Sequence, residues 1–349
     1  MVVTSSLLAL PKQPPGVEWP TQEWRHSEPS DDAARTRLDA VADLAFATDA
    51  KAVLGETHAL LVVHRGTVAL ERYGEGVAPD STLRSWSIAK SILHAVIGVL
   101  VRKGRIELDA TDLIPAWSSP SDPRRRISVR HLLQMRSGLR FTEDYSDPAS
   151  DAREMLFGAG REDMSAYAAS RPIAHPQGTH HSYSSGDSLL LSSIVGRAIG
   201  SGAEAARQFM TTELFQPLGM HSAKPRFDAS GTFIGSSYVF ATARDFARFG
   251  YLYLRDGSWG TQRILPEGWV DFARTPSPVA PNGEYGAHFW LAPKSTLGTF
   301  SAEGYDGQRL LIVPGLDLVI VRLGRTSPEK MMSVNRFLVD LIRCFPAPE

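Results

Sequence analysis

The stretch from Ser87 to Lys103 constrains the fold more strongly than any other part of this chain of 349 residues. Apolar side chains recur on every side of the helix that it predicts, and Gly104 follows as a glycine that ends a helix does. A helix that is apolar all round has no face to expose to water, so other elements have to enclose it. We therefore expect a large domain built around this helix, in a chain long enough for a second lobe.

Strand patterns lie towards both ends of the chain, and helical patterns lie between them. Two β-rich runs, 59–64 and 67–73, flank the turn Arg65-Gly66 and predict a hairpin. Further strands are expected at 299–301, 310–314 and 316–323, and amphipathic helices at 31–48, 242–254 and 327–342. The expected fold class is α/β (α+β): an antiparallel sheet between helices from the two chain ends, with an inserted all-α lobe.

The domain boundaries follow from where the pattern changes. From about Ala116 to Tyr238 the sequence shows short helices and loops rich in proline or glycine, without clear strands. We expect residues 1–115 and 239–349 to form one discontinuous α/β domain, with residues 1–35 as an extended arm, and 116–238 to form the helical lobe. The substrate cleft is expected between the domain and the lobe.

Composition narrows the classes of partner. The formal net charge is −1, so neither nucleic acid nor a membrane surface is an expected partner, and no run of about eighteen apolar residues could span a bilayer. Cys344 is the only cysteine, which excludes an internal disulfide and a thiolate metal cluster. The N-terminus lacks a basic signal region, which favours a cytoplasmic enzyme, monomeric or homodimeric, that acts on a small molecule.

Ser87 and Lys90 are the first candidates for chemistry. A serine alcohol needs an adjacent base to become a nucleophile, and residues three apart share one face of a helix. An ammonium group buried against an apolar helix has its pKa lowered, which makes it a proton acceptor. An uncompensated buried lysine is costly, so its presence here indicates a function. The same spacing recurs at Ser327 and Lys330, but Pro328 and Glu329 make that segment a simple helix start.

Two further segments are weak evidence for a catalytic site when each is taken alone. Tyr183 lies in a loop directly before a helical run, where a phenol can face a cleft and act as a general acid or base beside a lysine. Gly304 precedes Tyr305 and a strand, and a glycine there permits a close approach of the backbone to substrate. The backbone amides of Ser87 and Tyr305 could then form an oxyanion hole.

Together these motifs resemble a known family. Ser87-Ile-Ala-Lys90, Tyr183-Ser-Ser185 and Ala302-Glu-Gly304 occur in the order and rough spacing of the three motifs of serine β-lactamases, penicillin-binding proteins and related esterases. Residues 127–139 and 217–220 resemble supporting segments of the same superfamily. The resemblance covers about 59–325 and implies a β-lactamase/transpeptidase-like fold and a Ser87 acyl-enzyme, with Lys90 and Tyr183 as catalytic partners and no cofactor.

Within the superfamily the chain is most similar to 6-aminohexanoate-dimer hydrolases, and then to family VIII carboxylesterases and class C enzymes. The Tyr-Ser-Ser motif and the loop 143–148 carry this likeness, which implies that Tyr145 contacts the leaving amide. Ser185, Gly304 and Trp290 are expected to line the substrate site.

Two departures from the β-lactamase pattern bear on the substrate. Ser185 replaces an asparagine, and Ala302-Glu303 replaces the Lys-Thr pair that receives the β-lactam carboxylate. A glutamate there repels a carboxylate. A small-molecule amide or ester is therefore the expected substrate; a β-lactam, a D-amino-acid peptide, or a penicillin-recognising domain that acylates without turnover are the alternatives.

Other motifs are set aside. Gly186-Asp-Ser-Leu189 spells the signature of another esterase class, but it lies far from the N-terminus and lacks the late histidine that such enzymes use. His175, His180 and His181 share one loop without a carboxylate framework, so no metal site is expected. Whether these histidines or His288 line the cleft is open, as is the choice of Lys90 or Tyr183 as the base in acylation.

Overall fold

The computed structural model describes residues 7–26 and 32–346. Its centre is a six-stranded sheet in the order β2-β1-β11-β10-β9-β8, in which every neighbouring pair is antiparallel. The strands are β1 (Glu56–His64), β2 (Thr67–Tyr73), β8 (Trp290–Leu291), β9 (Phe300–Gly304), β10 (Gln308–Val313) and β11 (Leu318–Arg325). Arg65 and Gly66 both have positive φ, 48° and 80°, as a two-residue hairpin turn requires. The predicted hairpin is confirmed.

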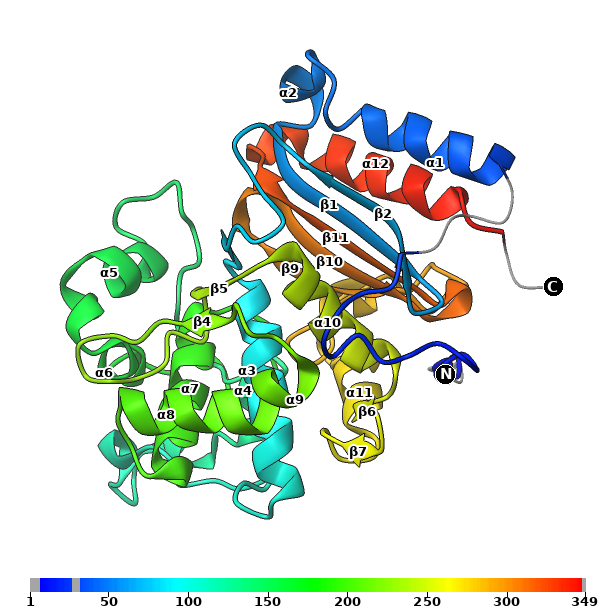
Figure 1. Ribbon diagram of the computed structural model, residues 1–349. Helices are drawn as coiled ribbons and strands as arrows, with labels where there is room; N and C mark the ends of the chain where they lie inside the picture. The colour runs from blue at the N-terminus through cyan, green and yellow to red at the C-terminus, as the bar shows by residue number, and fades with distance from the viewer. Residues whose placement is uncertain (1–6, 27–31, 347–349) are drawn as a thin grey trace.

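Both terminal helices lie on the same face of this sheet (Figure 1). Helices α1 (Asp32–Asp43) and α12 (Met331–Arg343) pack side by side there, and Leu38 and Leu338 share one buried cluster with Leu60 of β1. The other face is covered by α10 (Ala243–Leu254). The expectation that the terminal helices enclose the sheet from two sides is therefore wrong, because α10 takes the second face.

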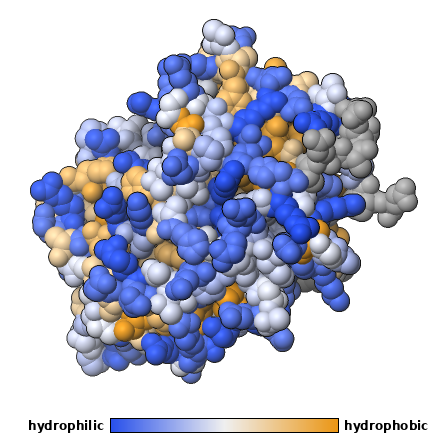
Figure 2. Space-filling view, in the orientation of Figure 1, coloured by the Kyte–Doolittle hydropathy of each residue, from blue (hydrophilic) through white to orange (hydrophobic). Residues whose placement is uncertain are grey.

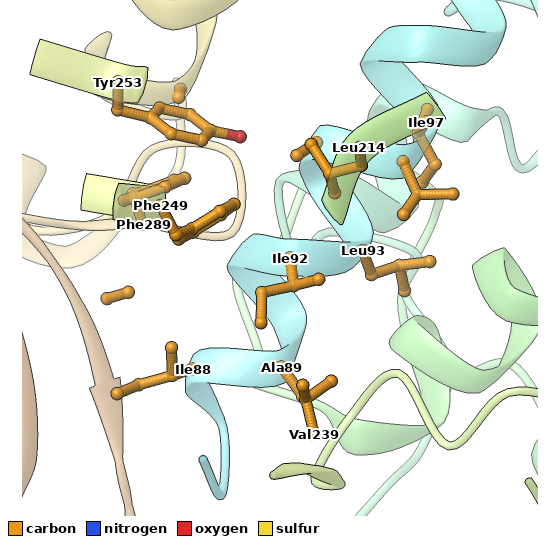
Figure 3. Packing of buried hydrophobic residues seen from close by; sticks show 14 of the residues in the cluster. Ile88, Ala89, Ile92, Leu93, Ile97, Leu214, Val239, Phe249, Tyr253 and Phe289 are labelled. Carbon is orange, nitrogen blue, oxygen red and sulfur yellow. The ribbon is translucent and has the colours of Figure 1, made fainter. Parts of the chain in front are cut away.

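Helix α3 (Ile88–Arg102) is the buried helix that the sequence predicts. All thirteen residues from Ile88 to Leu100 are buried, and Gly104 follows with a φ of 67°. Figure 3 shows how its sides are occupied: Ile92 faces the aromatic side chains of Phe249 and Phe289, whereas Leu93 faces Leu214. The helix lies between the sheet domain and the helices of the middle of the chain, so its N-terminal end lies where these two parts of the fold meet (Figure 1).

The middle of the chain is helical. Its elements are η1 (Pro115–Trp117), η2 (Pro123–Arg126), α4 (Val129–Leu133), α5 (Asp151–Phe157), η3 (Ala159–Glu162), α6 (Met164–Ala169), α7 (Ser185–Ile199), α8 (Ala203–Met210), the π-helical turn η4 (Thr211–Phe215) and α9 (Gln216–Leu218). One short strand, β4 (Lys224–Pro225), also lies within the stretch expected to be free of strands. The boundaries at 116 and 238 remain a prediction.

A small sheet joins the two parts. Strand β3 (Leu83–Arg84) precedes α3, and it forms a three-stranded sheet with β5 (Val239–Ala241) and β4, in the order β3-β5-β4. The remaining elements are α2 (Ala50–Val53), the hairpin β6 (Ser258–Trp259) and β7 (Gln262–Arg263), α11 (Trp269–Arg274), and the 3₁₀ turns η5 (Pro281–Gly283), η6 (Tyr305–Gly307), η7 (Pro314–Leu316) and η8 (Pro328–Lys330).

The described part of the N-terminal arm, residues 7–26, lies against α10. Arg248 of α10 donates to the carbonyl of Pro20 at 2.7 Å, and Trp24 is buried and donates to the carbonyl of Arg244. The first six residues and 27–31 of the predicted arm lie outside the described residues. Polar side chains cover most of the visible face of the molecule, with apolar ones in small separate groups (Figure 2). No helix in the described residues is long and apolar enough to cross a membrane.

Candidate active site

Ser87 stands at the turn between β3 and α3. Ser85 fixes the end of β3 by two bonds to Val239 of β5: its amide donates at 2.8 Å, and its hydroxyl accepts from the Val239 amide at 3.0 Å. Trp86 then takes a left-handed conformation, with φ at 45°, which is costly for a bulky residue. Ser87 occupies the N-cap position of α3, yet its side chain caps no backbone amide. Its hydroxyl is therefore available for other chemistry.

Lys90 lies directly beneath Ser87. Its Nζ is 3.1 Å from Ser87 Oγ, 3.1 Å from Ser185 Oγ and 2.9 Å from the carbonyl oxygen of Ser236. The side chain is 1% exposed. Burial lowers the pKa of this amine to about 8, and the negative charge of Glu143 acts in the opposite direction. A substantial fraction of Lys90 is therefore neutral near physiological pH and can accept a proton.

Glu143 connects the loop of the helical lobe to the start of α7. One carboxylate oxygen accepts from the Ser185 amide at 2.7 Å, and the other accepts from Ser185 Oγ at 2.6 Å. The second oxygen also accepts from the Tyr145 hydroxyl at 3.0 Å. Because Ser185 Oγ donates to Glu143, its lone pairs face Lys90, so the serine relays the negative charge of Glu143 towards the amine.

Tyr183 covers the other side of Lys90. The Nζ of Lys90 lies 4.9 Å from the centroid of the Tyr183 ring, and the Ser87 side chain is close enough to the Tyr183 hydroxyl to lower its pKa. Burial and the charge of Glu143 raise the pKa of Tyr183 well above its usual value, and the interaction with Ser87 only partly counters them. Tyr183 is therefore a neutral phenol, which indicates a proton donor. Lys90 is thus the partly neutral amine of the site and Tyr183 its neutral phenol.

Gly304 permits a close approach between β9 and the nucleophile segment. A Cβ atom on Gly304 would lie 2.4 Å from the carbonyl oxygen of Ser85 and 3.0 Å from Trp86 Cβ. Real Cβ atoms do not approach a backbone oxygen so closely, so any other residue would push β9 away. Asp306, with φ at 60°, then turns the chain sharply and leaves Tyr305 against Trp86, with ring centroids 5.5 Å apart.

A pocket of about 330 Å³ opens above these residues. Its lining comprises Ser87, Glu143, Tyr145, Tyr183, Trp290, Glu303, Gly304, Tyr305, Asp306, Arg309, Thr326, Pro328 and Met331. The structure thus brings all the site residues expected from the sequence together, with Lys90 and Ser185 bonded just beneath the lining. A hollow of about 500 Å³ elsewhere, beside Trp259 and Pro217, is lined by no titratable residue.

The histidines lie outside the pocket lining. His288 is buried under α3, where its Nδ1 bonds the carbonyl oxygen of Lys90 at 2.8 Å, and burial lowers its pKa to about 3. His175 and His180 stack on each other, and His181 packs on Tyr285. No group of three or more His, Cys, Asp or Glu in the described part of the chain is arranged to hold a metal ion.

The two motifs set aside on sequence grounds are structural in this fold. Ser327 bonds Glu329, and Lys330 donates to the carbonyl of Lys51 at 2.9 Å, so the two residues of that pair serve separate local contacts. Asp187, the acid of the other motif, lies in the first turn of α7 and accepts from Ser137 Oγ at 2.8 Å. Burial raises the pKa of Asp187 to about 7.

Sequence reasoning missed three parts of the site. The sequence places Glu143 only in the Tyr145 loop, and it marks neither the Ser236 carbonyl nor Trp86 as part of the site. Glu143 and Ser236 act on Lys90 across 53 and 146 positions of the chain, and no local pattern marks them. The one available signal was the short loop from Glu143 to Tyr145, which places two polar side chains near the cleft.

Comparisons with known proteins decide the family. The family model described as beta-lactamase matches residues 51–342. The chain belongs to the beta-lactamase family. It is a hydrolase with the beta-lactamase fold, and this fold implies a serine mechanism. The fold class and the enzyme class predicted from the sequence are confirmed.

The proteins that this chain is similar to include one curated relative and two solved structures. A 6-aminohexanoate-dimer hydrolase from Paenarthrobacter ureafaciens is 31% identical over 290 residues, which cover 76% of this chain and 72% of that one. A Bacillus anthracis structure provisionally assigned to the same activity matches with a TM-score of 0.74 and 22% identity, covering 97% of this chain and 92% of that one. EstCE1, a hydrolase with promiscuous acyltransferase activity, matches with a TM-score of 0.68 and 16% identity, covering 90% and 99%. The two structures show the common fold.

Proposed function

We propose that the protein hydrolyses amide or ester bonds of small molecules through an acyl-enzyme on Ser87, in the manner of 6-aminohexanoate-dimer hydrolases and carboxylesterases. The observation that carries this proposal is the contact of 3.1 Å between Ser87 Oγ and the Nζ of Lys90, a buried amine with a pKa of about 8, at the floor of a pocket. A hydroxyl so close to a partly neutral amine is an activated nucleophile. The 31% identity to a 6-aminohexanoate-dimer hydrolase supports the substrate class.

The reaction has two steps. Ser87 Oγ attacks the substrate carbonyl while Lys90 accepts its proton, and the amides of Ser87 and Tyr305 donate to the resulting oxyanion. When the carbonyl re-forms, the bond to the leaving amine or alcohol breaks, and Tyr183 passes it a proton that Lys90 replaces. A water molecule then attacks the acyl-enzyme by the reverse route, releases the acid and restores Ser87.

Glu303 supports a simple amide or ester over a β-lactam. Its carboxylate lies in the pocket lining beside Gly304, where it accepts from Ser301 Oγ at 2.9 Å and pairs with Arg309 at 3.3 Å. A carboxylate-bearing β-lactam would meet an acid at the position where the family's Lys-Thr pair receives it. A domain that acylates without turnover remains the second outcome of the test below.

Burst kinetics with p-nitrophenyl butyrate test the proposal. We expect a burst followed by steady turnover; a stoichiometric burst alone would indicate a non-turnover domain, and no burst with Ser87 intact would refute both. Ser87→Ala should abolish labelling by a fluorophosphonate. Ser327→Ala is the matched control, since it removes the serine of the same spacing outside the pocket and should label normally.

A substrate panel then orders the candidates: a nylon-type linear dimer, short-chain esters, a chromogenic cephalosporin and a D-alanyl peptide. We expect turnover of the linear amide and the esters to exceed that of the cephalosporin and the peptide. The cytoplasmic location and the monomeric or homodimeric state expected from the sequence remain predictions. Cell fractionation and sedimentation of the full chain test them.

A further inference from the structure

His288 is a buried, titratable residue to which the two-step reaction gives no role. It lies in the turn before β8, is 3% exposed, and has a left-handed backbone with φ at 55°. Its own amide donates to the carbonyl of Leu133 in α4 at 3.0 Å, and the amide of Gly286 donates to the carbonyl of Phe289 across the turn at 2.9 Å. Backbone bonds therefore hold this turn against the helical lobe.

The side chain and the carbonyl of His288 both contact the first turn of α3. Its Nδ1 lies 2.8 Å from the carbonyl oxygen of Lys90, and its own carbonyl accepts from Ser91 Oγ at 2.7 Å. On the other side of the ring, Nε2 lies 3.4 Å from Ser188 Oγ in α7. His288 thus connects two successive residues of α3 with α7.

These contacts decide the tautomer and the charge of the imidazole. A carbonyl oxygen can only accept, so Nδ1 has to carry the proton that it shares with Lys90. Nε2 then presents a lone pair to the hydroxyl of Ser188. Burial lowers the pKa of His288 to about 3, and the charge of Lys90 acts in the same direction. The ring is therefore an uncharged donor with one defined orientation.

The contact at the Lys90 carbonyl bears on where the Lys90 amine lies. Nζ bonds Ser185 Oγ of α7 at 3.1 Å, and the carbonyl of the same residue is connected through His288 to Ser188, about one helical turn further along α7. A lysine side chain is a flexible four-carbon stem. Its amine stays 3.1 Å from Ser87 Oγ only if the backbone that carries it is held.

We propose that His288 is a positioning residue for Lys90: its Nδ1–H holds the Lys90 carbonyl and so keeps the amine at hydrogen-bond distance from Ser87. This proposal rests on the proposed function and adds a residue that acts from outside the pocket. Glu143 and Tyr183 face the amine from the helical lobe, and the charge of Glu143 favours its protonated form. His288 is neutral and acts on the position of the amine. A displacement of about 1 Å can cost roughly a hundredfold in rate.

Three substitutions of His288 separate its hydrogen bond from its shape. His288→Asn supplies an amide N–H in place of Nδ1, and asparagine adopts a left-handed backbone readily. His288→Leu fills the space without a donor, whereas His288→Gly fits the left-handed backbone without a donor. The readout is single-turnover acylation by p-nitrophenyl butyrate, which gives the maximal acylation rate and the substrate concentration at half that rate separately.

We expect the maximal acylation rate of the Leu and Gly variants to fall roughly 10- to 100-fold, because the amine is no longer held beside Ser87. The half-saturating concentration should stay within about twofold of wild type, since His288 does not line the pocket. His288→Asn should retain at least about a third of the wild-type rate, because it keeps the donor.

Tyr253→Phe is the matched control. It removes the hydroxyl that lies 2.7 Å from Nδ1 of His94, a second buried histidine, one turn further along α3. Both positions then lose a buried hydrogen bond to α3, but only His288 is bonded to Lys90. The control should lose stability in urea and acylate at the wild-type rate.

Three results would overturn the proposal: wild-type acylation rates in the Leu and Gly variants, an Asn variant as slow as those two, or an equal loss of rate in Tyr253→Phe. Nitrogen-15 NMR of histidine-labelled wild type tests it without any loss of fold, with the His288 signal identified by its absence from His288→Asn. We expect protonated Nδ1 and unprotonated Nε2 from pH 5 to pH 9. A proton on Nε2 in place of Nδ1 would contradict the proposal as well.

None of these results would touch the proposed function, which stands on the Ser87-dependent turnover of wild type. Absence of that turnover would refute the proposed function, and the tautomer of His288 could still be measured in the same protein.

Discussion

Replacement of Glu143 by glutamine should shift the pH dependence of acylation towards acid. Lys90 must be neutral to accept the proton of Ser87, and burial places its pKa at about 8. The free-enzyme limb of kcat/KM should therefore rise about tenfold between pH 7 and pH 9, with a midpoint near 8. Because the pKa of Tyr183 is raised, no descending limb from that phenol is expected below about pH 10.

The size of the shift follows from the geometry. Lys90 Nζ and a Glu143 oxygen bond the same hydroxyl, that of Ser185, at 3.1 and 2.6 Å, so the two charges lie within about 6 Å. Two unit charges at that separation interact by about 0.7 kcal/mol at the dielectric constant of water and by about 3 kcal/mol at an effective value of 20. Since one pKa unit corresponds to about 1.4 kcal/mol, Glu143→Gln should move the midpoint down by about half a unit to two units.

The assay is the rate of inactivation by a neutral fluorophosphonate, measured from pH 5.5 to 10. This rate depends on the reaction of Ser87 alone and not on a later deacylation step. The midpoint is the informative quantity, because glutamine cannot accept all the bonds of Glu143 and the maximum rate should fall as well. Asp144→Asn is the control: it removes a neighbouring exposed carboxylate outside the pocket lining and should leave the midpoint unchanged. A midpoint in Glu143→Gln that stays at that of wild type, or moves towards alkali, would refute the assignment of Lys90 as the base under the influence of Glu143.

Three other perturbations test the fold and the site. Lys90→Met should change the pH dependence of stability. The pKa of Lys90 is about 8 in the folded protein instead of 10.5, so between these pH values the folded protein binds fewer protons than the unfolded chain. Urea denaturation should therefore show that the free energy of unfolding of the wild type rises through this pH window by about 3 kcal/mol relative to the variant. Gly304→Ala should lower kcat for p-nitrophenyl butyrate by roughly a hundredfold, because the new methyl group pushes β9 and the Tyr305 amide away from Ser87. Gly196→Ala is the control, since a Cβ atom at that position meets no atom within 4 Å. It should raise the free energy of unfolding by about 0.5–1 kcal/mol and leave kcat unchanged. Leu93→Ala in α3 should lower the free energy of unfolding by about 2–5 kcal/mol. Val339→Ala removes an exposed side chain and should change the free energy of unfolding by no more than about 0.5 kcal/mol. Equal effects of the two substitutions would contradict the burial of α3.

The residues that could be predicted are those whose role depends on neighbours in the sequence. Ser87 and Lys90 lie one helical turn apart, and the apolar run that follows identifies the helix as buried, which separates this pair from Ser327 and Lys330. The hairpin at Arg65 and Gly66 follows for the same reason, since the turn is local. The order of the three motifs then predicts one pocket.

Contacts between distant segments could not be predicted in this way. Amphipathic patterns show that α1 and α12 each bury one side, but no pattern within either helix says which face of the sheet it covers. The same limit applies to Glu143, whose bonds to Ser185 depend on how a loop folds over α7. From the sequence alone, a carboxylate in a loop is expected to be a solvated side chain. Only the tertiary packing shows that this one lies close to a buried amine.

The unfavourable features of the site sit next to the most completely buried element of the fold. The left-handed Trp86 costs of order 1–3 kcal/mol, and the lowered pKa of Lys90 corresponds to about 3 kcal/mol for keeping the amine charged at neutral pH. The burial of thirteen consecutive residues of α3 stabilises the fold by more than either cost, since a single buried leucine contributes about 2 kcal/mol. Helix α3 can therefore hold Ser87 at a strained turn and Lys90 in a desolvated position. Lys90 is therefore held where a base is needed beside Ser87, whereas Lys330, at the same spacing but outside the pocket, donates to the carbonyl of Lys51 in α2.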